Sequence, residues 1–219
     1  MLSLAVCAQS PLEAGFFGGM VVYQGDLSES DILEPKEINF AFGGLFRYHF
    51  NDKWKVRAHA IYGQISGSDK NAKDTGLKER GWSYESFIVE LTAVVEFHPL
   101  GRPREGMTGV FEKQLSPYVG VGGGFVNFNP RVKVTRPQDV GLFPEPQRTT
   151  TAPSFPLVAG LRFDFHQYYI ATFEAGWRLT FNDYLDGVSY NGNPKKNDPF
   201  IFTGLSMTYF FGYNAKFHF

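Results

Sequence analysis

The clearest pattern in the chain is an alternation of apolar and small or polar residues from residue 38 to residue 50. Apolar side chains dominate the even positions, whereas Asn39, Arg47 and His49 fall on the odd positions. Because successive side chains of a β-strand point to opposite faces, one face of this segment is a row of aromatics. The pattern is typical of a strand with lipid on one face and a barrel interior on the other.

Similar alternation recurs along the chain and predicts eight strands, at residues 14–24, 38–50, 54–65, 84–98, 117–128, 155–165, 169–181 and 200–211. Between them, the links 51–53 and 166–167 are short, whereas 25–37, 66–83, 129–154 and 182–198 are long. The link 99–115 is long where the alternation of links predicts a tight turn. The predicted fold is all-β: an eight-stranded antiparallel up-and-down transmembrane β-barrel over residues 9–219.

Link lengths also predict an orientation. Outer-membrane barrels turn tightly on the periplasmic side and carry their long loops outside the cell. We therefore expect a bacterial outer-membrane location, with both termini in the periplasm and the long loops extracellular.

Composition agrees with a barrel. Aromatic residues make up 17% of the chain, which suits aromatic girdles at two membrane interfaces. The mean hydropathy of −0.22 and the lack of any apolar run of about 20 residues argue against a helical span. The net charge of −1 provides no basic surface for nucleic acid, so none is expected as a partner.

The first eight residues resemble the end of a secretory signal peptide. Val6-Cys7-Ala8 fits the small-residue cleavage rule, with cleavage after Ala8, although the basic segment that normally comes first is missing. Cleavage would remove Cys7, the only cysteine. The alternatives are an uncleaved tail, or a lipoprotein acylated at Cys7, which the bulky Val6 disfavours.

Charges of both signs fall on the inward faces of the predicted strands. An eight-stranded barrel is only wide enough for side chains to fill it, and unpaired interior charges are costly. We therefore predict an interior plugged by cross-strand ion pairs, with an ion or proton path as the alternative. The expected network is Arg47, Arg57, Glu90, Glu96, Arg162, Glu174 and Arg178, accompanied by Lys55, His59 and Asp164.

No catalytic constellation is evident, so we predict a non-enzymatic protein without a cofactor or metal. The five histidines are scattered, without metal-ligand spacing. The Gly120–Gly124 run lacks the Lys-Ser/Thr of a phosphate loop and is interpreted as strand. Asp183 and Asp186 could bind Ca²⁺ but better fit turn capping. Glu90 and Glu174 have no nucleophile-base pair beside them.

Several segments together resemble a known family: residues 23–27, 43–48, 54–69, 183–189 and 202–209. The most distinctive is Asp-Tyr-Leu-Asp-Gly-Val-Ser at 183–189. These segments are similar to the PorG-like outer-membrane barrels of Bacteroidetes, which include a component of the type IX secretion system. The resemblance implies a barrel that anchors the periplasmic ring of the secretion machinery, with no catalytic residues.

The expected partners are therefore outer-membrane lipid and protein subunits of a secretion or envelope complex. The long charged link supplies candidate periplasmic contacts: Arg102, Arg104, Glu105, Glu112 and Lys113. The alternatives are a stand-alone barrel that transports or binds a small hydrophobic ligand, which a charged interior disfavours, and a purely structural outer-membrane protein.

Overall fold

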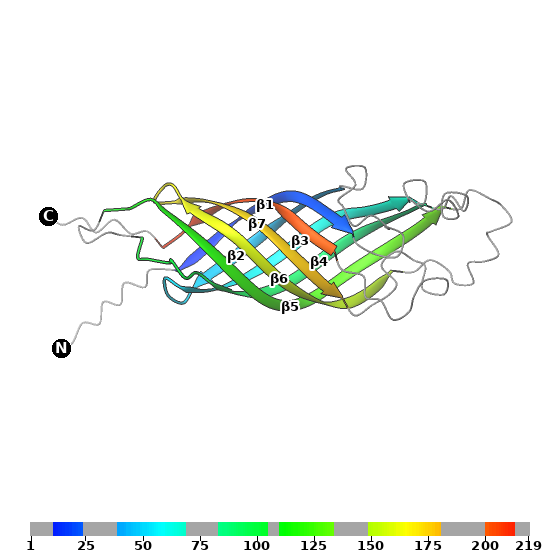
Figure 1. The fold of residues 1–219 in the computed structure, drawn as a ribbon, viewed down its shortest axis with the longest axis horizontal. Helices are drawn as coiled ribbons and strands as arrows, with labels where there is room; N and C mark the ends of the chain where they lie inside the picture. Colours follow the sequence, from blue (N-terminus) through cyan, green and yellow to red (C-terminus); the bar gives the residue numbers. More distant parts are fainter. Residues whose placement is uncertain are drawn as a thin grey trace.

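The computed structural model describes residues 11–23, 39–68, 83–104, 110–133, 149–180 and 200–212. They form eight strands: β1 (Leu12–Tyr23), β2 (Asn39–His49), β3 (Trp54–Ser68), β4 (Ser83–Phe97), β5 (Gln114–Lys133), β6 (Thr150–Asp164), β7 (Tyr169–Thr180) and β8 (Phe200–Phe210). Each strand pairs antiparallel with the next, and β8 pairs with β1 to close the barrel (Figure 1). The predicted fold is confirmed.

Strand ends differ from the prediction where the alternation fades. β5 (Gln114–Lys133) runs beyond the predicted 117–128 at both ends, because it pairs with β6 from Gln114 onward and with β4 as far as Lys133. β1 begins at Leu12 rather than at residue 14, which places Glu13 inside the barrel. Pairing with a neighbouring strand therefore extends these strands past the point where their own pattern stops.

The two ends of the barrel differ in how the strands connect. At the turn end, β1 begins, β8 ends, and the connections after β2, β4 and β6 lie together (Figure 1). The β2–β3 turn closes through Asn51, whose Oδ1 accepts hydrogen bonds from the main-chain N–H of Lys53 (2.9 Å) and Trp54 (2.8 Å). The opposite end, from which the links after β1, β3, β5 and β7 depart, is called the loop end here.

The outer face of the barrel is apolar on every strand. Phe16 and Phe40 expose 80% and 81% of their surface, and large side chains such as Phe125, Trp177 and Leu205 are also exposed. An apolar surface that encircles a protein is incompatible with water and matches the lipid-facing band of a membrane barrel. We therefore treat the strands as membrane-spanning. The described residues include no helix long and apolar enough to cross a membrane.

Aromatic pairs gather on the outer face near the turn end. Tyr48 contacts Phe50 with ring centroids 5.0 Å apart, and Trp54 contacts Phe97 at 4.8 Å. Tyr209 packs edge-on against Tyr169 at 5.6 Å. Such a cluster is expected of a girdle at a membrane interface, where aromatic rings meet lipid head groups.

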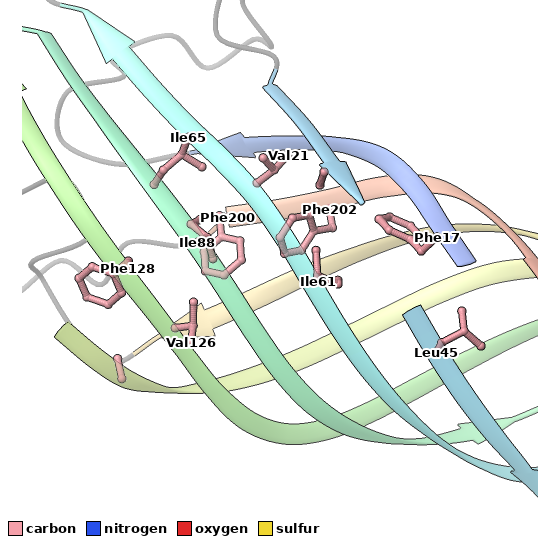
Figure 2. Close-up of a cluster of buried hydrophobic side chains, with 12 residues drawn as sticks. Phe17, Val21, Leu45, Ile61, Ile65, Ile88, Val126, Phe128, Phe200 and Phe202 are labelled. Atoms are coloured by element: carbon pink, nitrogen blue, oxygen red, sulfur yellow. The ribbon is translucent and has the colours of Figure 1, made fainter. Parts of the chain in front are cut away.

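Inside the barrel, the half nearer the loop end is apolar. Figure 2 shows Phe17, Phe200 and Phe202 with aliphatic side chains from β1 to β5 directed inward. This loop-end core comprises Phe17, Val21, Ala41, Leu45, Ile61, Ile65, Ile88, Val126, Phe128, Ala152, Phe200 and Phe202. The predicted interior charges therefore share the barrel with an apolar core, to which inward-facing Ile61, Ile88 and their neighbours belong.

Two neighbouring glycines on β5 face opposite environments. A Cβ at Gly124 would overlap the main-chain oxygen of Leu91 on β4, whereas a Cβ at Gly123 would meet nothing within 4 Å. We expect Gly124→Ala to lower the free energy of unfolding by about 1–3 kcal/mol, because the strand must shift. Gly123→Ala is the matched control and should stay within about 0.5 kcal/mol of wild type. Urea unfolding in lipid vesicles measures both, and equal effects would contradict the close approach of β4 and β5.

Candidate functional site in the barrel interior

Glu13 on β1 is the first centre of charge inside the turn-end half. Its carboxylate forms an ion pair with Arg47 and accepts a hydrogen bond from Arg162 Nη1 at 2.7 Å. Thr208 Oγ1 donates to the same carboxylate at 2.6 Å, and His49 Nε2 lies 2.9 Å from it. Glu13 is fully buried, and the guanidinium groups of Arg47 and Arg162 compensate the negative charge of its carboxylate.

Glu96 on β4 is the second centre. Arg47 Nε donates to it at 2.8 Å, and Arg57 Nε lies 3.1 Å from its other oxygen. Arg57 in turn reaches Glu174 on β7, with Nη1 2.6 Å from Oε2. The ionic chain therefore runs from Glu13 through Arg47, Glu96 and Arg57 to Glu174, and links strands on opposite sides of the barrel.

Strand register brings these like and unlike charges to one level. Arg47 pairs with Arg57 across the β2–β3 ladder, which would place two cations side by side. Glu13 is opposite Arg47 on the other side, and Glu96 on β4 is opposite Lys55, two residues from Arg57 along β3. Carboxylates therefore lie on both sides of the two arginines. Arg47 grips Glu96 through two nitrogens, Nε and Nη2, whereas Arg57 bridges Glu96 and Glu174.

A second, smaller pair lies beside residues of the loop-end core, since Glu90 is opposite Ile61 and Val126 and Arg178 is opposite Phe200. Arg178 Nε donates to Glu90 at 3.3 Å, and Ser154 Oγ donates to the same carboxylate at 2.7 Å. The guanidinium of Arg178 lies over the ring of Phe202, 5.1 Å from its centroid. This cation–π contact joins the ion pair to the loop-end core.

At the turn end, Arg104 reaches from the β4–β5 link into the barrel mouth. Its Nη1 donates to Asp164 at 2.5 Å, its Nη2 donates to the main-chain oxygen of Gln167 at 3.0 Å, and its guanidinium lies 4.4 Å from the ring centroid of Phe210. Burial lowers the pKa of Arg104 while Asp164 opposes that shift. Arg104 therefore fixes the link over the mouth, and its guanidinium is engaged inside the protein rather than presented to a partner.

A pocket of about 340 Å³ opens beside Arg104 at the turn end. Its apolar wall includes Pro11, Pro103 and Phe210. The charged side chains that line this turn-end pocket are Asp52, Lys55, Arg102, Arg104, Arg162 and Asp164.

All predicted interior residues lie buried inside the barrel, including Lys55, His59 and Asp164. The prediction omitted Glu13, although it shares the inward phase of Phe17 and a strand begun two residues earlier would have included it. It also omitted Tyr118, whose hydroxyl donates to Glu174 at 2.5 Å. The alternation of β5 is weak around Tyr118, so no sequence pattern marked this residue as a member of the network.

The predicted partner contacts divide into two kinds. Arg102, Glu112 and Lys113 are exposed on the link, whereas Arg104 is bound to Asp164 and to the main-chain oxygen of Gln167. Glu105 lies outside the described residues, as do Asp183 and Asp186, the candidate Ca²⁺ ligands. Within the described ranges, no three His, Cys, Asp or Glu side chains gather as a metal site would require.

The fold is similar to solved outer-membrane barrels. Neisserial surface protein A matches with a TM-score of 0.53 and 10% identity over 92% of this chain and 98% of that chain. The outer membrane protein OprG of Pseudomonas aeruginosa matches with a TM-score of 0.46 and 14% identity over 90% and 94%. No curated protein sequence matches. A family model matches residues 1–218, and the chain therefore belongs to the family described as domain of unknown function DUF6089.

Proposed function

We propose that this protein is a non-enzymatic barrel of the bacterial outer membrane that holds a periplasmic protein complex at its turn end. In this orientation the turn end and both termini face the periplasm and the long loops face outward, as link lengths favour. The resemblance to PorG-like barrels makes the periplasmic ring of the type IX secretion machinery the partner that we propose. Its role there is to anchor the ring under the membrane.

The observation that carries this proposal is the β4–β5 link. It is longer than a periplasmic turn needs to be, and Arg104 holds it across the barrel mouth. The main-chain N–H of Glu112 donates to the oxygen of Arg104 at 3.1 Å, so the two arms of the link also contact each other. These contacts hold the part of the link that carries the exposed side chains of Arg102, Glu112 and Lys113, as a docking surface requires.

The filled interior supports an anchoring role over conduction. Ion pairs occupy the turn-end half, and the loop-end core with the Arg178–Glu90 pair occupies the other half. An eight-stranded barrel has no room for a channel beside such side chains. We therefore expect planar-bilayer recordings of the purified barrel to show no ion current steps.

Alanine at Arg102, Glu112 and Lys113 together should abolish partner capture while the barrel stays folded. These exposed side chains contribute little to stability, so the loss would be one of binding. The measurement is identification of proteins that co-purify with the tagged protein from gently solubilised outer membrane. Arg131→Ala, an exposed cation near the loop end, is the control and should leave capture unchanged. Undiminished capture by the triple variant would refute the link as the docking surface.

A second candidate function is binding of a small hydrophobic ligand by a stand-alone barrel, and the loop-end core is the observation that favours it. Aromatic and aliphatic side chains there provide the surface that such ligands prefer. Native mass spectrometry of the detergent-released barrel tests this function. A stoichiometric bound lipid or metabolite, together with no co-purifying protein, would favour it over anchoring.

A further inference from the structure

Lys55 is a buried cation without an ion-pair partner in the described part of the chain. Its side chain points into the turn-end pocket and the residue is 5% exposed. The hydrogen bond of its Nζ goes to the main-chain oxygen of Asp52, at 3.2 Å. Arg162 and Arg47 are close enough to repel the ammonium group of Lys55. Glu96 and Glu13 attract it, but both carboxylates already form ion pairs with arginines.

The pocket around Lys55 has an excess of positive charge. Its lining includes four cationic side chains, Lys55, Arg102, Arg104 and Arg162, and two acidic ones. One of the acids, Asp164, is already shared between Arg104 at 2.5 Å and Arg162 at 2.8 Å. Within the described residues, Arg162 Nη2 and Arg104 Nε have no hydrogen-bond partner although both are buried.

A buried ammonium beside other cations lowers the stability of a fold, and unpaired guanidinium N–H groups add to that cost. Methionine at position 55 would fill the same space without the charge. Destabilising charge concentrated in one cleft is a feature of binding sites, where a ligand supplies the missing partner. The missing partner here is an oxyanion that accepts from Lys55 and from the free N–H groups of the two arginines.

We propose that the turn-end pocket binds a carboxylate group carried by the periplasmic partner protein, either an acidic side chain or a chain terminus. A volume of about 340 Å³ accommodates one or two side chains and excludes a folded domain. Arginine forks match the planar carboxylate, and Pro11, Pro103 and Phe210 contact the carbon atoms next to it. This inference rests on the proposed function, which brings a periplasmic protein to this face.

The test is a titration of the refolded, isotope-labelled barrel with acetylated tetraglutamate, followed by NMR. We expect saturable shifts at residues around the pocket, and Lys55→Met should weaken binding about ten-fold or more because a buried charge pair is lost. Lys53→Met, an exposed cation on the adjacent turn, is the control and should bind like wild type. Absence of saturable binding, or equal binding by Lys55→Met, would overturn the proposal.

Two further readouts separate the alternatives. Lys55→Met should unfold at a higher urea concentration than wild type, which excludes misfolding as the cause of weak binding; a lower midpoint would show that Lys55 is structural and overturn the proposal. Inorganic phosphate at matched ionic strength should bind more weakly than the peptide. If phosphate bound as tightly as the peptide, the ligand of the pocket would be a free anion. The proposal that a partner protein supplies the carboxylate would then be overturned.

Co-purification from cells distinguishes this inference from the proposed function. Capture of a periplasmic partner by wild type but not by Lys55→Met supports both. Equal capture by wild type and Lys55→Met overturns the pocket as the contact while the anchoring function stands. Peptide binding by a wild-type protein that captures no partner overturns the anchoring function and leaves the carboxylate chemistry of the pocket supported.

Discussion

Replacing Glu13 with glutamine is expected to lower the free energy of unfolding by about 3–5 kcal/mol, because removal of one partner leaves buried charges uncompensated. Arg47 and Arg162 both lie on this carboxylate, and both side chains are buried. Glutamine keeps the size and can still accept from Thr208, so the loss measures charge rather than packing. Among the described residues, no other carboxylate contacts both Arg47 and Arg162.

The measurement is urea unfolding of the barrel in lipid vesicles, followed by tryptophan fluorescence. Glu112→Gln removes the same charge from the exposed link and should change stability by less than about 0.5 kcal/mol. The double variant Glu13→Gln with Arg162→Met should recover part of the loss, since it removes one of the orphaned cations. A Glu13→Gln barrel within about 1 kcal/mol of wild type would show that the ionic chain does not hold the turn-end half together.

The fold could be predicted because lipid and interior impose opposite chemistry on alternate residues. β2 is the clearest case: Phe40, Phe42 and Phe46 face lipid, while Arg47 faces inward. A period of two fixes the face of each residue without any knowledge of its neighbours. This period alone assigned the predicted interior charges to the inward faces of their strands.

The height of a residue along the barrel could not be predicted in the same way. Height depends on strand tilt and on the register between neighbours, neither of which is written in the alternation. Ile61 and Ile88 share the inward face with Arg57 and Glu96, yet they belong to the loop-end core. The gathering of apolar interior side chains into the loop-end core therefore appears only once the barrel is closed.

Arg104 shows a different limit of sequence reasoning. Its charge and its place in a long link predicted a partner contact, as they did for Arg102 and Lys113, which are exposed. Its actual partner, Asp164, is sixty residues away at the end of β6. Only closure of the barrel brings that carboxylate and the ring of Phe210 to the link, so no local pattern distinguishes Arg104 from its neighbours.

Replacing Phe202 with alanine is expected to lower the free energy of unfolding by about 3–5 kcal/mol, because a buried ring leaves both lost transfer energy and a cavity. Phe202 packs edge-on against Phe200 with centroids 5.4 Å apart and lies under the guanidinium of Arg178. It therefore contacts both the Arg178–Glu90 pair and the rest of the loop-end core. The surrounding strands are fixed by the barrel ladders and cannot close the space.

Phe125→Ala is the matched control, since Phe125 points outward from β5 into the lipid region. Lipid chains refill the space left there, so only the transfer energy of the ring is lost, about 1.5–3 kcal/mol. The difference between the two variants in urea unfolding then measures the cavity inside the barrel. Equal losses would mean that the interior around Phe202 repacks as freely as lipid, which would contradict a rigid, tightly packed loop-end core.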